Sequence, residues 1–407
     1  MLALAVAASG CGGQHHRPSG LPTPPPSGRV TPAFGITEGN AHLIAPGSAD
    51  PAPSGFAWAR AALWSLHPRY LRVDVDWSKL QPRPDQPPGL DTPQDGCARG
   101  RPPCAPYRGL RDVLAAIAAR QRAGSPVEPV LNFYGAPAWA ASAPGSCEPP
   151  ATPRAARAPR PQALPAYAAL VSDVLALARS VGLQVYYLSP WNEPNSPLFL
   201  SPQRDVCDAG APPARSAAAY AALVRTMRGV LRSDPQPHVL VLGELAGGAG
   251  AGPYSSAIPE FVFALPDDVV CSAGVWSMHA YARYPRPGAD QAALLERALD
   301  RRARCARGAS IWVTETGAGA PRPGGARQST PVEQHAACQA QGAMLDRWDR
   351  DPRVKAIFQY SFRQDPAFPV GLIGPALKRP FWTFFLWKVW NWPAYGGGDP
   401  RLWAGCA

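Results

Sequence analysis

The amino-acid sequence predicts an α/β fold, the (β/α)8 TIM barrel, with enlarged loops at the C-terminal face of its strands. Eight short runs rich in β-forming residues recur from residue 33 onward, and segments with helical periodicity separate them. Runs such as VLVLG are apolar at consecutive positions, which is typical of strands buried on both faces of a parallel sheet. A doubly wound sheet shares this alternation, but no glycine-rich phosphate-binding motif follows the first run, so the barrel is favoured.

The expected strands follow one another along a single domain without an internal repeat. They are residues 33–38, 70–75, 127–134, 185–189, 239–243, 275–279, 310–314 and 355–360. Helices are expected between them where apolar residues recur at i, i+3, i+4 and i+7. The clearest examples are Leu110, Val113, Leu114 and Ile117, and Tyr220, Leu223, Val224 and Met227. Each of these stripes can cover one face of a sheet.

Composition excludes several classes of protein. A chain of 407 residues with 46% hydrophobic and 17% charged residues can bury a large core, so we expect a globular protein. No apolar run reaches the ~18 residues that a membrane-spanning helix needs, which excludes a polytopic membrane protein. The net charge of +11 comes mainly from scattered arginines rather than from a basic stripe with exposed aromatics, so nucleic-acid binding is not expected. Attraction to an anionic glycan or cell wall remains open.

The first residues indicate export. Residues 1–11 form a short apolar stretch that ends in small residues and Cys11, and residues 12–32 form a proline-rich linker before the catalytic domain, residues 33–407. Ala-Ser-Gly-Cys resembles the bacterial lipoprotein processing site, so a membrane anchor on a lipidated Cys11 and a plain secretory signal are both open. We expect an extracellular or cell-surface protein.

The other cysteines support the same location. They number eight, an even set that suits four disulfides in an exported chain. Their positions predict the pairs Cys97–Cys104, Cys147–Cys207, Cys271–Cys305 and Cys338–Cys406. No Cys-x-x-Cys pair or neighbouring histidine set is present, so a zinc site is not expected.

Two glutamates stand where expected strands end. Glu193 lies in Ser-Pro-Trp-Asn-Glu-Pro-Asn after the fourth run, and Glu315 lies in Thr-Glu-Thr-Gly after the seventh. Barrel chemistry takes place at the C-terminal ends of the strands. Two carboxyl groups ~5–5.5 Å apart across the barrel mouth can cleave a glycosidic bond with retention, because one protonates the leaving oxygen while the other attacks the anomeric carbon.

These motifs resemble the acid/base and nucleophile motifs of the clan A (β/α)8 retaining glycoside hydrolases, particularly families 39 and 5. The resemblance covers roughly residues 33–390. It implies that Glu193 is the general acid/base, that Glu315 is the nucleophile, and that Asn192 holds the 2-hydroxyl of the reacting sugar.

The resemblance extends to two other strands. It implies that Arg72, in Leu-Arg-Val-Asp-Val-Asp-Trp, lies beside the nucleophile, and that Tyr281, in His279-Ala-Tyr, contacts the nucleophile through its phenol. An arginine beside a nucleophilic carboxylate lowers its pKa and keeps it ionised. Taken alone, Arg72 could instead pair with Asp74, and His279 could be a structural core histidine.

Other polar and aromatic residues near strand ends are candidates for the sugar site. Asn132 and Tyr134 lie on the third run and Trp139 follows it, although Trp139 could equally pack within its loop. Many clan members carry a tryptophan on strand eight, which this chain lacks. Two alternatives are open: Tyr360 or Phe362 takes its place, or the catalytic sugar subsite is more open. Four other carboxylates are expected to be polar rim or subsite groups: Glu38 and Glu244 at strand ends, and Asp76 and Asp365 in or near the top loops.

Together these observations predict an exported, monomeric, retaining O-glycosyl hydrolase that acts on an oligo- or polysaccharide without a cofactor or metal. Two alternatives stay open. One is a cell-surface glycan-binding protein that has lost turnover, because a fold does not establish activity. The other is a transglycosidase, in which a sugar hydroxyl instead of water intercepts the intermediate.

Overall fold

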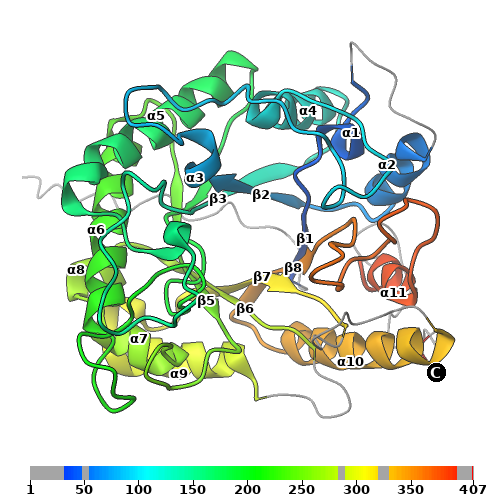
Figure 1. Cartoon of the computed structure of the whole chain (residues 1–407). Coiled ribbons are helices and arrows are strands. Elements are labelled where there is room, and N and C mark those ends of the chain that lie inside the picture. Colours follow the sequence, from blue (N-terminus) through cyan, green and yellow to red (C-terminus); the bar gives the residue numbers. More distant parts are fainter. Residues whose placement is uncertain (1–31, 48–54, 283–288, 320–329, 392–405, 407) are drawn as a thin grey trace, which may run out of the picture.

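The computed structural model describes residues 32–47, 55–282, 289–319, 330–391 and 406. Its strands form a closed parallel barrel in the order β1 to β8, with helices around the outside (Figure 1). The predicted fold class is therefore confirmed. The strands are β1 (Ala33–Thr37), β2 (Tyr70–Asp76), β3 (Glu128–Tyr134), β4 (Tyr187–Ser189), β5 (Val239–Ala246), β6 (Val275–His279), β7 (Ser310–Thr316) and β8 (Val354–Tyr360).

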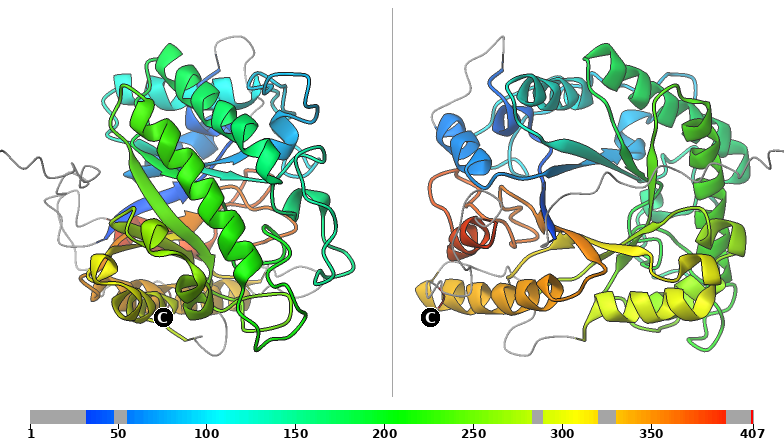
Figure 2. Two further views of the ribbon diagram at one scale, coloured as in Figure 1. Left: turned by 90° about the vertical axis from the view of Figure 1, so that its left-hand side faces the viewer. Right: turned by 180° about the vertical axis from the view of Figure 1, so that it is seen from behind.

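The helices surround the strands on all sides in the views of Figure 2. The α-helices are α1 (Ala41–Ile44), α2 (Phe56–Trp64), α3 (Trp77–Leu80), α4 (Gly109–Arg122), α5 (Leu164–Ser180), α6 (Ala214–Ser233), α7 (Ile258–Ala264), α8 (Asp267–Val270), α9 (Gln291–Arg302), α10 (Pro331–Asp349) and α11 (Trp382–Trp390). Short 3-10 helices are η1 (Arg154–Ala156), η2 (Pro161–Ala163) and η3 (Arg304–Ala306). Both expected apolar stripes, on α4 and α6, are buried against the barrel.

One helix is apolar enough to need comment. Residues 161–180, which include α5, have the length and composition of a membrane-spanning helix. In this fold, however, the apolar face of α5 is buried inside the protein, including Tyr167, Leu170, Val171 and Val174. Packing against the barrel accounts for this hydrophobicity.

The expected strands are found at their predicted places, with two extensions that matter for the site. β5 runs to Ala246 and β7 to Thr316, beyond the expected ends at residues 243 and 314, so Glu244 and Glu315 lie within strands. Register shifts interrupt the pairing of β5 with β6 and of β7 with both of its neighbours. Such bulges insert a residue and re-aim the side chains that follow.

The lower interior of the barrel is filled by aromatic rings. Tyr70, Tyr187, Trp312 and Phe358, from four different strands, form what we call the aromatic layer. The Trp312 ring centroid lies 4.9 Å from that of Tyr70 and 4.8 Å from that of Tyr187. Gly35 on β1 makes room for this layer, because a Cβ atom at that position would overlap the Phe358 ring.

Along the strands, toward their C-terminal ends, the side chains inside the barrel change from apolar to charged. Successive side chains of a strand point to opposite faces, so Tyr70, Arg72 and Asp74 of β2 share the inner face at rising heights. Arg72 therefore lies one step above the aromatic layer, toward the C-terminal ends of the strands.

Three of the four expected disulfides are present. Cys97 is bonded to Cys104, Cys271 to Cys305, and Cys338 to Cys406. The expected bond between Cys147 and Cys207 is wrong: both are free cysteines in this structure. The two thiols lie close enough to interact with each other, but no bond joins them. The thiol of Cys147 also lies 3.2 Å from the carbonyl of Pro253, and that of Cys207 lies 3.4 Å from the carbonyl of Ser146. The signal-like residues 1–11, with Cys11, and residues 12–31 of the linker lie outside the described residues.

Candidate active site

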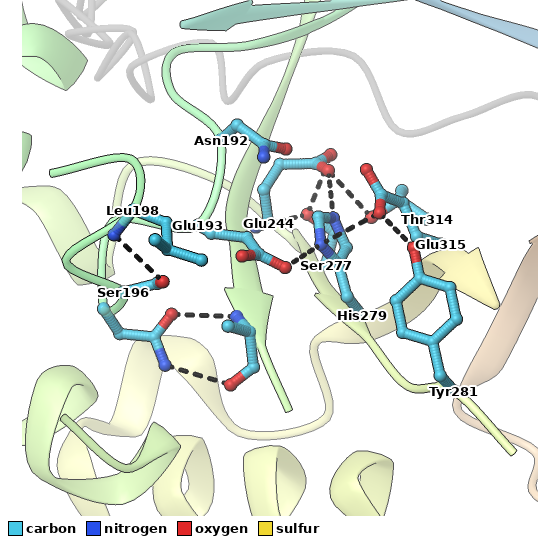
Figure 3. A network of polar contacts seen from close by, with 12 residues as sticks. Asn192, Glu193, Ser196, Leu198, Glu244, Ser277, His279, Tyr281, Thr314 and Glu315 are labelled. Atoms are coloured by element: carbon cyan, nitrogen blue, oxygen red, sulfur yellow. Dashed lines mark hydrogen bonds and ion pairs between the residues drawn. The ribbon is translucent and has the colours of Figure 1, made fainter. Parts of the chain in front are cut away.

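The two expected catalytic glutamates lie together at the mouth of the barrel. Glu193 lies in the loop that follows β4, and Glu315 lies near the end of β7. A carboxylate oxygen of Glu193, a carboxylate oxygen of Glu315 and a nitrogen of His279 all lie within 4.8 Å of one another. Figure 3 shows His279 between the two carboxyl groups. This spacing suits the shorter, ~5–5.5 Å separation that double displacement at a sugar requires.

The segment Trp-Asn-Glu-Pro-Asn is held by side chains at both of its ends. Trp191 is buried and donates from its indole to the carbonyl of Phe199 at 2.8 Å. Asn195 accepts from the backbone N–H of Ala246 at 2.8 Å and donates to the carbonyl of the same residue at 3.1 Å. Between these anchors Glu193 has a positive φ of 38°. A left-handed residue fixed on both sides presents its side chain in one direction.

Arg72 connects the carboxylates from below. It is fully buried, with Nη1 2.8 Å from Glu315 Oε1 and 3.1 Å from Asp74 Oδ1. Its Nη2 donates at 2.9 Å to Glu244 Oε2 and at 2.9 Å to Asn192 Oδ1. Burial opposes the charge, but the surrounding carboxylates raise the pKa of Arg72 well above its ordinary value. The guanidinium is therefore a permanent cation at the base of the site.

His279, at the end of β6, contacts a carboxylate through each ring nitrogen. Its Nδ1 lies 2.8 Å from Glu193 Oε1, and its Nε2 lies 2.8 Å from Glu244 Oε2. Glu315 Oε2 is 3.5 Å from Nδ1. Burial lowers the pKa of His279, but Glu315, Glu193 and Glu244 together raise it to about 10. With Arg72, Glu244 and Glu315, this residue forms what we call the charged layer.

Glu315 has three polar partners in the protein. The phenol of Tyr281 donates to Oε2, while Arg72 and His279 supply positive charge. Phe368 packs edge-on against Tyr281, with ring centroids 4.9 Å apart. Burial raises the pKa of Glu315, and His279 and Arg72 oppose that rise. Arg72 thus acts in the expected direction, but the expectation of a net lowered pKa is wrong because burial is the larger effect.

Glu244 was expected at the rim, and that expectation is wrong. It is fully buried on β5, where Gly243 and Glu244 both have positive φ and the register with β6 shifts. The bulge turns its carboxylate into the barrel, where Thr314 donates to Oε2 at 3.0 Å and Ser277 Oγ lies 3.3 Å from Oε1. A glycine within a strand-like run, followed at once by a carboxylate, is the sequence signal that could have indicated this bulge.

Two amide side chains complete the floor beside Arg72. Asn132 on β3 is fully buried and donates to Asp74 Oδ1 at 2.9 Å and to Asn192 Oδ1 at 3.0 Å. Both contacts of Asn192 use its oxygen, and within the described part of the chain its amide nitrogen has no protein partner. That N–H group can donate to a ligand hydroxyl. The structure therefore brings Asn132 and Asn192 together, with Asp74 between them and solvent.

Aromatic residues close the mouth on the β8 side. Tyr360 lies with its ring centroid 6.4 Å from that of Tyr281 and 5.8 Å from that of Phe368. Phe362 is fully buried in the outer core and does not reach the site. Of the two candidates for the missing strand-eight tryptophan, Tyr360 is the one beside the catalytic groups.

The remaining candidates are placed elsewhere. Trp139 packs edge-on against Trp77, with ring centroids 5.7 Å apart, and donates from its indole to the carbonyl of Gln81, so it fills the loop after β3. Glu38 was also expected at the rim or in a subsite, but it is buried and accepts from the backbone N–H groups of Asn40 and Arg363. Asp76 caps α3, and Asp365 pairs with Arg99 at the exposed edge.

A metal ion does not fit these donors. Glu193, His279 and Glu315 could reach one point, but both nitrogens of His279 already face carboxylates, and the guanidinium of Arg72 contacts Glu315. A metal would have to displace the imidazole from both partners and would lie near a buried cation. The charges needed to stabilise the carboxylates come from Arg72 and His279 instead.

Solved structures share this fold. No protein-family model and no curated protein matches the chain. A family 39 glycoside hydrolase from the gut symbiont Bacteroides cellulosilyticus WH2 is similar with a TM-score of 0.52 and 16% identity, over 89% of this chain and 64% of that one. The GH39 enzyme from Xanthomonas axonopodis pv. citri gives 0.54 and 14%, over 91% and 67%. A monomeric beta-xylosidase from Caulobacter crescentus CB15 gives 0.53 and 14%, over 89% and 68%.

The chain thus spans about two thirds of the length of these neighbours. At such low identity, the likeness extends to the fold alone. The resemblance inferred from the motifs around Glu193 and Glu315 is confirmed at that level, because the barrel found here is the fold of these glycoside hydrolases.

Proposed function

We propose that the protein is a retaining glycoside hydrolase that cleaves O-glycosidic bonds by double displacement. One observation carries the proposal: at the barrel mouth, a carboxyl group held by Arg72 and Tyr281 lies within 4.8 Å of a second carboxyl group held by His279. The shared fold with family 39 enzymes supports the same class.

In the first step Glu315 is the nucleophile. Its carboxylate attacks the anomeric carbon, the bond to the leaving oxygen breaks, and Glu193 gives its proton to that oxygen. Glu193 suits the acid role because it has no contact with Arg72, whereas Glu315 and Glu244 both do. Glu315, by contrast, receives both the guanidinium of Arg72 and the phenol of Tyr281, as suits a carboxylate that carries negative charge before and after each cycle.

In the second step Glu193 is the base. It takes a proton from water, the water oxygen attacks the anomeric carbon, and the bond to Glu315 breaks to return both carboxyl groups to their starting states. The phenol of Tyr281 already donates a hydrogen bond to Glu315, so it can stabilise the negative charge that returns to this carboxylate. Two inversions at one carbon give net retention.

The substrate class follows from the polar floor. Asn192, Asn132 and Asp74 offer an amide N–H group and a partly exposed carboxylate beside the nucleophile, which suit the hydroxyls of a sugar ring. We therefore propose an oligo- or polysaccharide substrate, a monomeric enzyme and no cofactor. The signal-like residues 1–11 support an exported enzyme, with Cys11 as the point of lipid attachment if the chain is anchored.

The proposal is tested with Glu193→Ala and Glu315→Ala on a panel of aryl glycosides with good and poor leaving groups. For Glu193→Ala we expect a loss of about 10²–10⁴-fold on poor leaving groups and a much smaller loss on activated ones, because only poor leaving groups need protonation. Azide should restore turnover of the Glu193→Ala enzyme by attacking the intermediate. Glu315→Ala should lose activity on both kinds of substrate.

Glu128→Ala serves as the control, because Glu128 begins β3 at the opposite end of the barrel. Its activity should match the wild type. The anomeric form of the first product, followed by proton NMR, should be that of the substrate. An inverted product, or an active Glu315→Ala enzyme, would contradict the mechanism. Binding of glycans without any turnover by the wild type would indicate a glycan-binding protein.

A further inference from the structure

Glu244 lies at the centre of the charged layer, yet neither step of the proposed mechanism uses it. Its Oε2 is 2.9 Å from Arg72 Nη2, 2.8 Å from His279 Nε2 and 3.0 Å from Thr314 Oγ1. In Figure 3 the contacts from His279 and Thr314 converge on the carboxylate of Glu244, with His279 extending from it toward Glu193 and Glu315. A fully buried carboxylate with this many partners calls for a role of its own.

We propose that Glu244 is a positioning residue that keeps His279 as an imidazolium, so that the ring donates a hydrogen bond to the acid/base Glu193 throughout the reaction. The inference rests on the proposed function for the roles of Glu193 and Glu315. It concerns a residue that touches neither the sugar nor the reacting atoms and acts only through His279.

The geometry places an oxygen of Glu193 and an oxygen of Glu244 2.8 Å from the two nitrogens of His279. When both carboxyl groups are ionised, as in the second step, the ring needs two N–H groups to donate to both, and a neutral imidazole has only one. The charged and titratable groups facing the ring come from four elements: Glu244 from β5, Tyr281 from its own end of β6, Glu315 from β7, and Glu193 from the loop after β4. Arg72 of β2 approaches only through Glu244 and Glu315. Carboxylates therefore dominate the surroundings of the imidazole.

Glu244 is the only one of these carboxylates whose charge stays fixed during the cycle. Glu193 gives up and regains a proton, and Glu315 becomes an ester. Burial opposes the ionisation of Glu244, but Arg72, His279 and Thr314 lower the pKa of this carboxyl group to about 2. Its negative charge therefore persists when Glu315 loses its own, and His279 keeps its second proton.

The second step benefits most from this arrangement. When Glu315 is esterified, Glu193 must be a carboxylate to act as base. A positive imidazolium 2.8 Å away stabilises that carboxylate and fixes its direction. Without Glu244, the ring could lose a proton once Glu315 is neutral. The remaining N–H could still donate to Glu193, but the positive charge beside the Glu193 carboxylate would be gone.

The first measurement uses the wild-type protein. Labelling with ¹⁵N-histidine gives ring-nitrogen signals for seven histidines, and the spectrum of His279→Gln identifies the signal of His279. We expect both ring nitrogens of His279 to carry protons at pH 8, where a histidine with an ordinary pKa is neutral. A neutral ring at that pH would overturn the proposal, whether or not a substrate is known.

The second measurement compares Glu244→Gln with two other variants. We expect the titration of His279, and with it the alkaline limb of kcat/KM, to move about 1–3 pH units lower in Glu244→Gln, because an opposite charge in contact is lost. Thr314→Val removes one donor to Glu244 and should give a smaller shift in the same direction. Glu38→Gln is the matched control, a buried strand-end carboxylate that contacts none of the catalytic groups, and should leave both profiles unchanged.

If Glu244 had only a structural role, its substitution would lower stability and activity but would shift neither the titration of His279 nor the pH dependence of kcat/KM. Wild-type titration of His279 in a folded Glu244→Gln protein would therefore overturn the proposal. If Glu244→Gln does not fold, Thr314→Val decides, and an unshifted His279 titration there would overturn it equally. Failure of the proposed function looks different: no glycoside would be cleaved at any pH, while the NMR titrations would still report on Glu244 and His279.

Discussion

The aromatic layer and the charged layer occupy the same barrel, one above the other, and are stabilised by opposite means. In the lower layer Tyr70, Tyr187, Trp312 and Phe358 exclude water by packing ring against ring. In the upper layer buried carboxylates form ion pairs with Arg72 and His279, with N···O distances of 2.8–2.9 Å. Apolar burial contributes favourable free energy directly. Buried ion pairs do so only when their Coulombic attraction exceeds the cost of removing both groups from water.

The difference shows how one fold separates stability from chemistry. The strands enter both layers, so the aromatic layer fixes their spacing just below the charged side chains. The charged layer can then hold like charges close together without opening the barrel. We expect variants of the lower layer to change stability at every pH, and variants of the upper layer to change how stability and activity depend on pH.

The largest effect is expected for Trp312→Ala. Removing the ring opens a cavity among Tyr70, Tyr187 and Phe358 and should lower the free energy of unfolding by about 3–5 kcal/mol. Urea denaturation followed by circular dichroism measures this loss. Trp58→Ala on α2 is the control, because that side chain is 42% exposed and its loss should change stability by no more than about 0.5 kcal/mol. Equal losses in the two variants would mean that the aromatic layer is not the stabilising core.

A smaller, pH-dependent effect is expected for His279→Gln. The neighbouring carboxylates raise the pKa of His279 in the folded protein to about 10 from an ordinary 6.5. A raised pKa of a basic group contributes stability that is fully present below about pH 6.5 and is lost as the pH rises through 10. The difference in melting temperature between wild type and His279→Gln should therefore shrink from pH 6 to pH 10.

Trp312→Ala supplies the comparison for that experiment. Its melting temperature should be lower than that of the wild type by the same amount at every pH, because no titrating group is removed. A constant difference between wild type and His279→Gln across the same range would show that the histidine carries no extra proton in the folded state.

The smallest effect is expected for Trp139→Phe. The substitution keeps an aromatic ring against Trp77 but removes the indole donor to the carbonyl of Gln81, so stability should fall by about 0.5–1.5 kcal/mol. KM and kcat should not change, since the structure places Trp139 in loop packing. A marked rise in KM would instead indicate that Trp139 contacts the sugar, as its sequence position first suggested.

The sequence predicted the barrel because its strands are continuous apolar runs, and such runs between helical stripes have few arrangements. It indicated the positions of Glu193, Glu315, His279 and Tyr281 because each lies at or just after a strand end within a distinctive motif. Arg72, within the second strand, was placed beside Glu315 by the family resemblance, and the alternation of side chains along a regular strand is consistent with that place.

The misses have local causes. Glu244 depends on a bulge, and a bulge reverses the face on which the next residue lies, so alternation fails there. The loops after the third and fourth strands do bring Cys147 and Cys207 together, as the sequence predicted, but the two thiols stay unbonded. For Trp139 the sequence left the sugar site and loop packing equally open, because a residue after a strand can turn toward the mouth or away from it, and the structure shows loop packing.

The bulge in β5 also limits how this constellation could be moved to another scaffold. Gly243 has a φ of 104° and lies so close to Ser277 that a Cβ atom would overlap the backbone oxygen of that serine. A designer who copied only the four charged side chains onto regular strands would find the fifth-strand carboxylate on the helix side. The unit that must be transplanted is therefore the glycine, the extra residue and the small serine opposite, together with the charges they orient.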